Sequence, residues 1–316
     1  MSIKKNTFSF NGNEKATINV ISWIPETTIE GIIVIVHGMA EYANRYDEFA
    51  RFLAQSRYAV YAHDQRGHGF TLHNSKVGFF AKKDGWELIL SDLHKLVKLT
   101  QEKHPNVPTI LFGHSMGSLL ARTYAIDYGK FINKLIIAGT AIDPGLKSTL
   151  GLGLAKTLSF LVKPHSSSYI LTLLTFAGAN KTYKNRRTKF DFISRDNDVV
   201  DQYKNDPLCG FYCSNSFYVD MLTGLKYISR NENIRKIPSS LPILIISGDD
   251  DPVGDYGKGV EKVYLQLKSN GCADVTFKLY SGARHELINE INRKEIYENI
   301  LEWIKKHHIT STELNH

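Results

Sequence analysis

Residues 113–117 read Gly-His-Ser-Met-Gly, which places Ser115 between two glycines in the pattern G-x-S-x-G. An apolar run at 108–112 precedes the pattern, and a run that favours a helix follows from residue 118. In so tight a strand-to-helix turn, glycines allow close backbone approach, and the serine hydroxyl is pushed out above the sheet. The N–H groups that open the helix would face negative charge on a reacting carbonyl. The pattern therefore predicts that Ser115 is a nucleophile.

The same five residues also have an ordinary interpretation. Three fixed positions of common residue types recur by chance in roughly one of ten chains of this length. The alternative to a nucleophile is a strand-to-helix turn in which the serine only caps the helix. Other parts of the chain have to distinguish the two interpretations.

A base is the next requirement, because a serine hydroxyl is a weak nucleophile at neutral pH. Where such a turn carries a catalytic serine, an acid and then a histidine follow it along the chain. His285 comes soon after an apolar run at 275–280, and it is the only histidine between residue 251 and the last helical pattern. This position predicts that His285 is the base.

Three adjacent carboxylates, Asp249, Asp250 and Asp251, follow another apolar run at 242–247. A carboxylate at this point could orient the histidine and stabilise its positive charge. Aspartates also gather in turns for purely local reasons. Spacing alone does not decide which of the three faces the active site.

Two backbone N–H donors are needed to stabilise the oxyanion that forms when a serine attacks a carbonyl. The N–H of Met116, directly after Ser115, is the first candidate. The second is expected after the first parallel strand, where Gly38 permits a tight turn and Met39 follows it. We assign structural rather than chemical roles to three nearby histidines, His37, His68 and His114.

The elements that would carry these residues alternate between strands and helices. Runs typical of buried strands occupy 31–36, 58–63, 108–112, 134–138, 242–247 and 275–280. Helical patterns occupy 44–55, 84–103, 118–125, 256–268 and 291–307. Alternating runs at 6–10 and 16–23, joined by Asn-Gly-Asn, predict an antiparallel hairpin. We therefore predict an α/β fold: a mostly parallel sheet with helices on both faces and its site at the carboxyl ends of the strands.

The alternation stops between residues 141 and 236, where apolar helical pieces, a basic segment and aromatic loops replace it. We interpret 141–236 as a mainly helical cap inserted into a core made of 1–140 and 237–316. One face of the first apolar piece is rich in leucine and could face the core, line an acyl pocket or touch a membrane. Its members are Leu152, Leu154, Leu158 and Leu161.

The composition is that of a globular protein of 316 residues, of which 42% are hydrophobic and 22% charged. Three cysteines imply no disulfide framework and no signal peptide is recognisable, so we expect a cytoplasmic protein. We expect no metal, no cofactor and no nucleic-acid partner, because no matching motif accompanies the net charge of +7. The basic segment 181–189 is either solvated surface or a contact with anionic lipid.

Five segments together carry a family resemblance. They are His37-Gly-Met-Ala-Glu41 with Arg45-Tyr46, Asp64-x-Arg-Gly-His-Gly69, Gly113-His-Ser-Met-Gly117, Gly248-x-x-Asp251-x-Val253 and Gly282-Ala-Arg-His-Glu286. The chain resembles the α/β-hydrolases of the monoacylglycerol lipase and lysophospholipase type, the serine aminopeptidase S33-like group. The resemblance implies an α/β-hydrolase fold with Ser115 as nucleophile, Asp251 as acid and His285 as base. It also implies that the N–H groups of Met39 and Met116 form the oxyanion hole.

The expected reaction is hydrolysis of a carboxylic ester through an acyl-enzyme. The resemblance and the leucine-rich cap favour single-chain lipid esters, such as monoacylglycerols or lysophospholipids. A carboxylesterase for short acyl chains is the main alternative. A peptidase, an acyltransferase and a non-catalytic ligand receptor on the same fold are further alternatives. We also hypothesise peripheral membrane contact through the cap.

Overall fold

The computed structural model describes residues 2–72, 76–183 and 185–307. Its centre is one eight-stranded sheet with the strand order β1-β2-β4-β3-β5-β6-β7-β8. The strand pairs from β4 to β8 are parallel. The hairpin of β1 and β2 pairs antiparallel with itself and, through β2, with β4. This arrangement confirms the predicted α/β fold and the hairpin at its edge.

The predicted strands are all present. The strands are β1 (Ile3–Asn11), β2 (Thr17–Pro25), β3 (Gly31–Val36), β4 (Tyr58–His63), β5 (Thr109–His114), β6 (Lys134–Ala138), β7 (Ile243–Gly248) and β8 (Val275–Tyr280). The helices are α1 (Asp47–Gln55), α2 (Gly85–Lys103), α3 (Met116–Tyr128), α4 (Leu146–Leu161), α5 (Tyr169–Thr175), α6 (Asn197–Asn205), α7 (Asn215–Ile228), α8 (Asn231–Ile234), α9 (Lys258–Ser269) and α10 (Arg293–Lys306). Short 3-10 helices are η1 (Asn13–Lys15), η2 (Ala43–Tyr46), η4 (Gly129–Phe131), η5 (Asp191–Ile193) and η6 (Leu287–Asn289).

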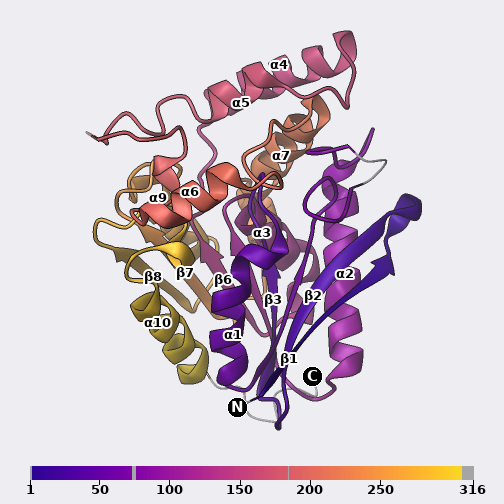
Figure 1. Ribbon diagram of the computed structural model, residues 1–316, viewed down its shortest axis with the longest axis vertical. Helices are drawn as coiled ribbons and strands as arrows, with labels where there is room; N and C mark the ends of the chain where they lie inside the picture. Colours follow the sequence, from indigo (N-terminus) through magenta and orange to yellow (C-terminus); the bar gives the residue numbers. More distant parts are fainter. Residues whose placement is uncertain (1, 73–75, 184, 308–316) are drawn as a thin grey trace.

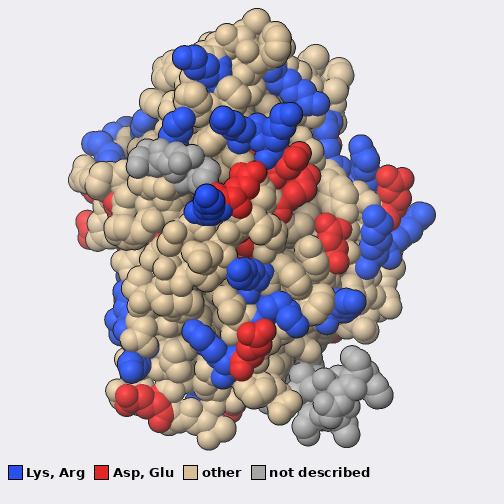
Figure 2. All heavy atoms as spheres, turned by 90° about the vertical axis from the view of Figure 1, so that its right-hand side faces the viewer, with Lys and Arg blue, Asp and Glu red and all other residues tan. Residues whose placement is uncertain are grey.

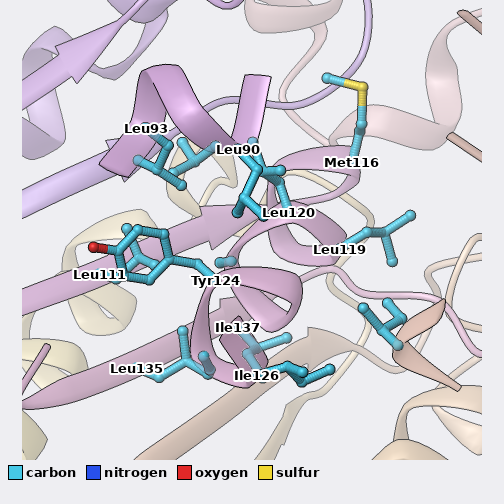
Figure 3. Close-up of a cluster of buried hydrophobic side chains, with 14 of the residues drawn as sticks. Leu90, Leu93, Leu111, Met116, Leu119, Leu120, Tyr124, Ile126, Leu135 and Ile137 are labelled. Carbon is cyan, nitrogen blue, oxygen red and sulfur yellow. The ribbon is translucent and has the colours of Figure 1, made fainter. Parts of the chain in front are cut away.

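Helices cover both faces of the sheet and form two apolar clusters with it. α1 and α10 pack on one face, whereas α2, α3 and α9 pack on the other. Figure 3 shows part of the second cluster, where Leu111 and Leu135 of the sheet lie near Leu120 and Tyr124 of α3. Every residue of β3 is buried, and a strand buried on both faces needs a continuous apolar run. This burial is why the central strands show no polar alternation in the sequence.

Between β6 and β7, the described chain forms the helices α4 to α8 and no strand. α4 and α5 form a layer at the top of the molecule, at the end farthest from the N-terminus (Figure 1). α7 instead packs against α2, α3 and α4, and its Phe217 and Leu225 belong to the same apolar cluster as the sheet. The division into core and cap stays a prediction, and within 141–236 the helix α7 packs with the predicted core.

Candidate active site

The turn around Ser115 joins β5, which ends at His114, to α3, which begins at Met116. Ser115 has the backbone angles φ 53° and ψ −122°, a region that side-chain-bearing residues rarely adopt. A Cβ added at Gly117 would lie 2.1 Å from the carbonyl oxygen of Val36, and one at Gly113 would lie 2.4 Å from the Gly117 carbonyl oxygen. Close backbone approach therefore requires both glycines of the pattern.

Three predicted site residues form one hydrogen-bonded chain. The Ser115 Oγ lies 2.8 Å from His285 Nε2, and His285 Nδ1 lies 2.9 Å from Asp251 Oδ2. Asp251 is fully buried and His285 is 5% exposed, whereas Ser115 is half-buried. Each of the three follows a strand, β5, β7 or β8, at the same edge of the sheet. The hydroxyl is thus placed to lose its proton to an imidazole that a carboxylate holds in position.

Only one of the three adjacent aspartates reaches His285. Asp251 also accepts hydrogen bonds from the Val253 N–H at 2.9 Å and from the Ser247 hydroxyl at 3.3 Å, which fix its carboxylate. Asp249 accepts a bond from the Gly282 N–H instead, and Asp250 is partly exposed. The geometry therefore selects the aspartate that spacing left open.

The charges around His285 favour the protonated form of its imidazole. Burial lowers the pKa of His285, but the charge of Asp251 and the hydrogen bond to it outweigh burial, so the pKa lies above the ordinary 6.5. The charges of Glu286 and Glu41 act in the same direction. The site therefore stabilises the imidazolium that forms when serine loses its proton.

The two predicted oxyanion donors follow two neighbouring strands, β5 and β3. Met116 is the first residue of α3, and Met39 follows the end of β3. Within the described residues, neither N–H group donates a hydrogen bond to the protein. Two backbone donors without a protein acceptor, beside a nucleophile, are available to a developing oxyanion.

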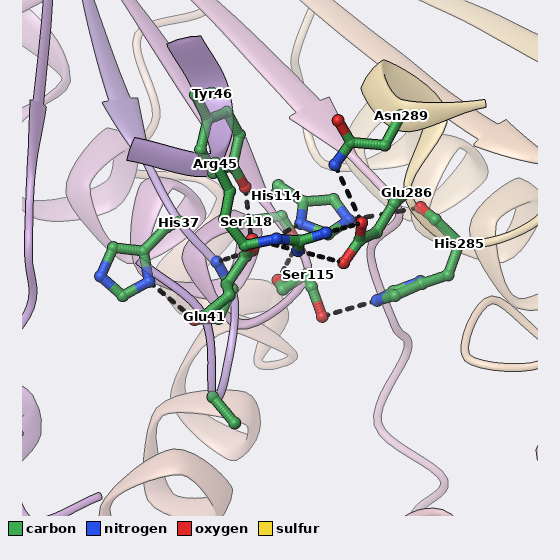
Figure 4. A network of polar contacts seen from close by, with 12 residues as sticks. His37, Glu41, Arg45, Tyr46, His114, Ser115, Ser118, His285, Glu286 and Asn289 are labelled. Carbon is green, nitrogen blue, oxygen red and sulfur yellow. Dashed lines mark hydrogen bonds and ion pairs between the residues drawn. The ribbon is translucent and has the colours of Figure 1, made fainter. Parts of the chain in front are cut away.

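A network of buried charged side chains lies next to residues 37–41, the predicted oxyanion loop (Figure 4). The Glu41 Oε1 accepts hydrogen bonds from the Gly38 N–H at 2.5 Å and from the Tyr46 hydroxyl at 2.9 Å, and it lies 3.1 Å from His114 Nδ1. The Arg45 guanidinium binds Glu41 at 3.0 Å. Burial raises the pKa of Glu41, but the hydrogen bond and charge of His114 and the charge of Arg45 outweigh it and hold the pKa far below 4.5. Glu41 is therefore an anion that fixes the start of the loop.

Glu286 extends this network to the loop after β8, which carries His285. Arg45 binds Glu286 through two parallel bonds of 2.6 and 2.7 Å. His114 Nε2 lies 3.2 Å from the carbonyl oxygen of His285. Sequence reasoning assigned His114 a packing role and gave Glu41, Arg45 and Glu286 no role. The available signal was weak, because the Glu41–Arg45 pair at i,i+4 resembles an ordinary surface pair.

The two other histidines to which we assigned structural roles, His37 and His68, are buried, as are the cysteines. His37 is buried and its Nε2 accepts the Gln65 N–H at 2.9 Å, and burial lowers its pKa. His68 Nδ1 lies 3.0 Å from the Arg66 carbonyl oxygen, and burial lowers its pKa to about 3. All three cysteines are free and buried. Among the described residues, no group of three or more His, Cys, Asp or Glu could hold a metal ion.

An apolar cavity of about 310 Å³ begins at Met39 and Ala40, beside the proposed oxyanion hole. Among the described residues of its wall, Lys189 is the only charged one. The other lining residues are Tyr169, Thr172, Leu173, Phe176, Ala177, Gly178, Phe190, Phe192, Tyr203, Gly210, Phe211 and Tyr212. Aromatic rings and α5 thus supply most of the wall, and they all come from the predicted cap.

The leucine-rich face of the first apolar piece does not line this cavity. Leu158 packs against the sheet cluster, whereas Leu161 is 71% exposed and Leu154 is 37% exposed. The piece therefore divides its leucines between the core and the surface.

Part of the basic segment lies close to the cavity. The Lys189 ammonium lies 4.8 Å from the centre of the Phe190 ring and 5.2 Å from that of Tyr212. Arg187 pairs with Asp201 at 2.6 Å on the surface. Lys184 lies outside the described residues.

The chain is similar to known proteins over most of its length. The family model described as serine aminopeptidase, S33 matches residues 27–292. A monoacylglycerol lipase of Mycolicibacterium smegmatis is 27% identical over 97% of this chain and 99% of its own. The monoglyceride lipase of Rattus norvegicus is 30% identical over 85% of this chain and 80% of its own. A solved thermostable carboxyl esterase of Bacillus coagulans, in complex with glycerol, has a TM-score of 0.88 at 31% identity, covering 98% of this chain and 100% of its own.

Proposed function

The chain belongs to the serine aminopeptidase S33 family, and on that premise we propose that it hydrolyses single-chain lipid esters, such as monoacylglycerols or lysophospholipids. The observation that carries the proposal is the chain of hydrogen bonds from Ser115 through His285 to Asp251, with an apolar cavity starting at Met39. Ser115 is the nucleophile, His285 the base and Asp251 the acid. The N–H groups of Met39 and Met116 form the oxyanion hole.

In the first half of the reaction, His285 Nε2 takes the proton of Ser115 while Oγ attacks the ester carbonyl carbon. The carbonyl electron pair moves onto oxygen, where the two N–H donors stabilise the charge. Removing one such donor costs about 3 kcal/mol in comparable enzymes. The tetrahedral intermediate collapses, the bond to the alkoxy oxygen breaks, and the departing alcohol receives the proton from His285.

In the second half, the acyl chain is held as an ester of Ser115. His285 takes a proton from water, and the resulting hydroxide attacks the acyl carbon. Collapse of this second intermediate returns the proton from His285 to Ser115 Oγ and releases the fatty acid. Every atom in the balance comes from the ester and one water molecule.

The lipid character of the substrate is supported by the wall of the cavity. Its side chains are almost all apolar or aromatic, and such a wall favours an acyl chain over a charged or strongly hydrated group. Two relatives compared above are named as lipases of monoacylglycerols, and both match most of this chain. The cavity and the relatives point to the same substrate class.

We further infer that 141–236 acts as a cap and that its outer segment, residues 146–178 with α4 and α5, contacts an anionic lipid surface. The outer segment exposes large apolar side chains, among them Phe160 at 88% and Leu161 at 71%. Residues 144–190 contain eight Lys and Arg side chains and no Asp or Glu; three of the eight lie in the outer segment and five follow it at 181–189. Since the whole chain has a net charge of +7, this stretch carries all of the excess positive charge.

On the face in Figure 2, Lys and Arg side chains lie below an uncharged apex, and Figure 1 places α4 at that height. Apolar residues above a basic belt suit an interface with anionic head groups. Among the described residues, no helix is both long and apolar enough to cross a membrane.

The test of the proposed function is labelling with a fluorophosphonate, which reacts with an activated serine. Ser115→Ala should lose labelling and ester hydrolysis while its melting temperature stays close to that of the wild type. Ser269→Ala, on the exposed surface of α9, is the matched control and should be labelled fully. Undiminished labelling of Ser115→Ala would refute the assignment of the nucleophile.

A carboxylesterase for short acyl chains is the second candidate, because the solved neighbour at 31% identity is named a carboxyl esterase. A series of p-nitrophenyl esters of increasing chain length, run beside monoacylglycerol and lysophosphatidylcholine, separates the two. We expect the rate to rise toward longer chains and both lipids to be turned over. A preference for acetate or butyrate, with no turnover of the lipids, would select the second candidate.

A further inference from the structure

We propose that Tyr203, in the cap, is a positioning residue for the oxyanion hole, and that it acts by holding the carbonyl oxygen of Ala40. The inference rests on the proposed function. It concerns an inner segment of the insertion, residues 183–213, which includes η5 and α6. The inner segment is hydrogen-bonded to the catalytic loops, whereas among the described residues no such bond joins the outer segment to them.

The oxyanion loop is held from two sides. On the core side, Glu41 accepts the Gly38 N–H. On the cap side, the Ala40 carbonyl oxygen accepts the Tyr203 hydroxyl and the Gly210 N–H, both at 2.9 Å. Met39, the proposed oxyanion donor, lies between these two anchored points. The direction of its N–H therefore depends on both anchors.

Backbone strain shows that the loop needs such anchors. Ala40 has φ 54°, a left-handed conformation that is unfavourable for a residue with a Cβ. Residues of this kind persist only where their surroundings determine the conformation. Two hydrogen bonds to one carbonyl oxygen supply that constraint, and both donors belong to the inner segment.

The Tyr203 side chain is itself fixed. It is 7% exposed, and the Arg45 guanidinium lies 4.7 Å from its ring centre. Burial raises the pKa of Tyr203 well above 10, so the hydroxyl keeps its proton and stays a donor. Arg45 is in turn bound by Glu41 and Glu286, so the Tyr203 ring packs against a guanidinium that is itself fixed.

The inner segment holds the other two catalytic loops in the same way. The Tyr183 hydroxyl donates to the Asp250 carbonyl oxygen at 2.7 Å, next to the proposed acid. The N–H groups of His285 and Glu286 donate to the carbonyl oxygens of Phe192 at 3.2 Å and Ile193 at 2.7 Å. The loops that bear Met39, Asp251 and His285 are thus each bonded to the inner segment, and Tyr203 is one of the two anchors at Ala40.

The experiment compares Tyr203→Phe with Tyr61→Phe. Tyr203→Phe removes one hydroxyl and keeps the ring under Arg45. Tyr61 is as deeply buried, and its hydroxyl lies 2.7 Å from Nε2 of His104, at the carboxyl end of α2. We expect kcat of Tyr203→Phe to fall about tenfold with KM within about twofold, since a looser donor acts mainly in the transition state. Both variants should lower the melting temperature by a similar amount, because each loses one buried hydroxyl. Only Tyr203→Phe should change kcat.

The alcohol part of the substrate separates positioning from direct contact, because Tyr203 also lines the cavity. A positioning role predicts the same fold-loss of kcat for a monoacylglycerol and a p-nitrophenyl ester of the same acyl chain. It also predicts that affinity for a trifluoromethyl ketone, whose adduct places an oxyanion in the hole, falls by the same factor as kcat/KM.

Three results would overturn the inference. A loss confined to the glycerol ester would assign the hydroxyl to the leaving group. A raised KM with unchanged kcat would assign it to substrate binding, and unchanged kinetics would remove any role in the reaction. Failure of the proposed lipid substrate is distinguishable from all three, because the comparison of variants can still be made with the p-nitrophenyl ester.

Discussion

The two segments of the insertion differ in how they meet the rest of the molecule. The inner segment is bonded to the oxyanion, acid and histidine loops through named donors and acceptors. Its Phe192 and Ile193 are almost fully buried, at 5% and 2% exposure. The outer segment exposes a series of apolar side chains and contacts α7, through the packing of α4 and through bonds from the Asn215 and Ser216 N–H groups to the Ser166 and Pro164 carbonyl oxygens.

One insertion can therefore serve two purposes with two kinds of contact. Hydrogen bonds are directional and can fix a loop to a fraction of an ångström, which a catalytic group needs. Apolar contact is non-directional, so exposed apolar side chains can meet a fluid partner such as a lipid surface. We therefore expect changes in the inner segment to act on kcat and stability, and changes in the outer segment to act on access to lipid.

The largest effect is expected from pH, which acts on the proposed base, His285, whose N–H is bonded to Phe192 of the inner segment. His285 must be neutral to accept the serine proton, and its pKa is raised above 6.5, chiefly because Asp251 outweighs burial. Lowering the pH through that raised pKa protonates the base, so kcat/KM should fall about tenfold for each further pH unit. The measurement is a pH profile of p-nitrophenyl ester hydrolysis in the wild type.

The profile also sharpens the comparison of the two segments. A variant of the outer segment, such as Phe160→Ser, should keep the same midpoint, because the charges that raise the pKa of His285 come from Asp251, Glu286 and Glu41. A rate that is independent of pH down to two units below 6.5 would contradict the role of His285. A midpoint that moves in Phe160→Ser would contradict the separation of the segments.

The next largest effect is expected from the same substitution, glycine to alanine, made once in each segment. Gly210 has φ 65°, and an added Cβ would lie 2.6 Å from the Phe190 ring. Gly210→Ala should therefore lower the free energy of unfolding by about 2 kcal/mol and reduce kcat by displacing its bond to Ala40. Gly153 in α4 has no atom within 4 Å of an added Cβ, so Gly153→Ala should stabilise the helix by about 0.5–1 kcal/mol.

Urea unfolding and p-nitrophenyl ester kinetics measure both variants of this pair. Stabilisation by both substitutions would show that the inner segment tolerates a side chain at residue 210 and is not closely fitted to the oxyanion loop. Loss of kcat in Gly153→Ala would show that the outer segment also sets the catalytic geometry.

Much of the fold and the position of the candidate site could be predicted from the sequence. Parallel strands end at one edge of a sheet, so the loops that follow β3, β5, β7 and β8 were expected at that edge. This rule places Met39, Ser115 and His285 at the same edge, and the order of serine, acid and histidine along the chain singled out His285. The choice of Asp251 among three neighbours needed the family resemblance, because all three follow the same strand.

The roles of Tyr203, Tyr183 and Phe192 could not be predicted in this way. Their partners lie on loops far away in the sequence, 163 residues away for Tyr203 and Ala40, and several contacts run through backbone atoms. Nearly every residue type has the same backbone N–H and carbonyl groups. A hydrogen bond between backbone atoms therefore leaves no pattern of residue types in the sequence. The outer segment has the opposite problem: its leucines were recognised, but helical periodicity did not decide which of them reach the core.

The smallest effect on the protein itself is expected from Phe160, the most exposed of the large apolar side chains of the outer segment, at 88%. Phe160→Ser should leave the free energy of unfolding within about 0.5 kcal/mol, because the ring packs against little of the protein. Binding to vesicles that contain phosphatidylserine should weaken about fivefold, since less apolar surface enters the interface. Leu265→Ser on α9, where the leucine is 56% exposed, is the matched control and should not alter binding. Equal loss in both variants, or binding that is insensitive to salt, would show that the outer segment is not the lipid-facing surface.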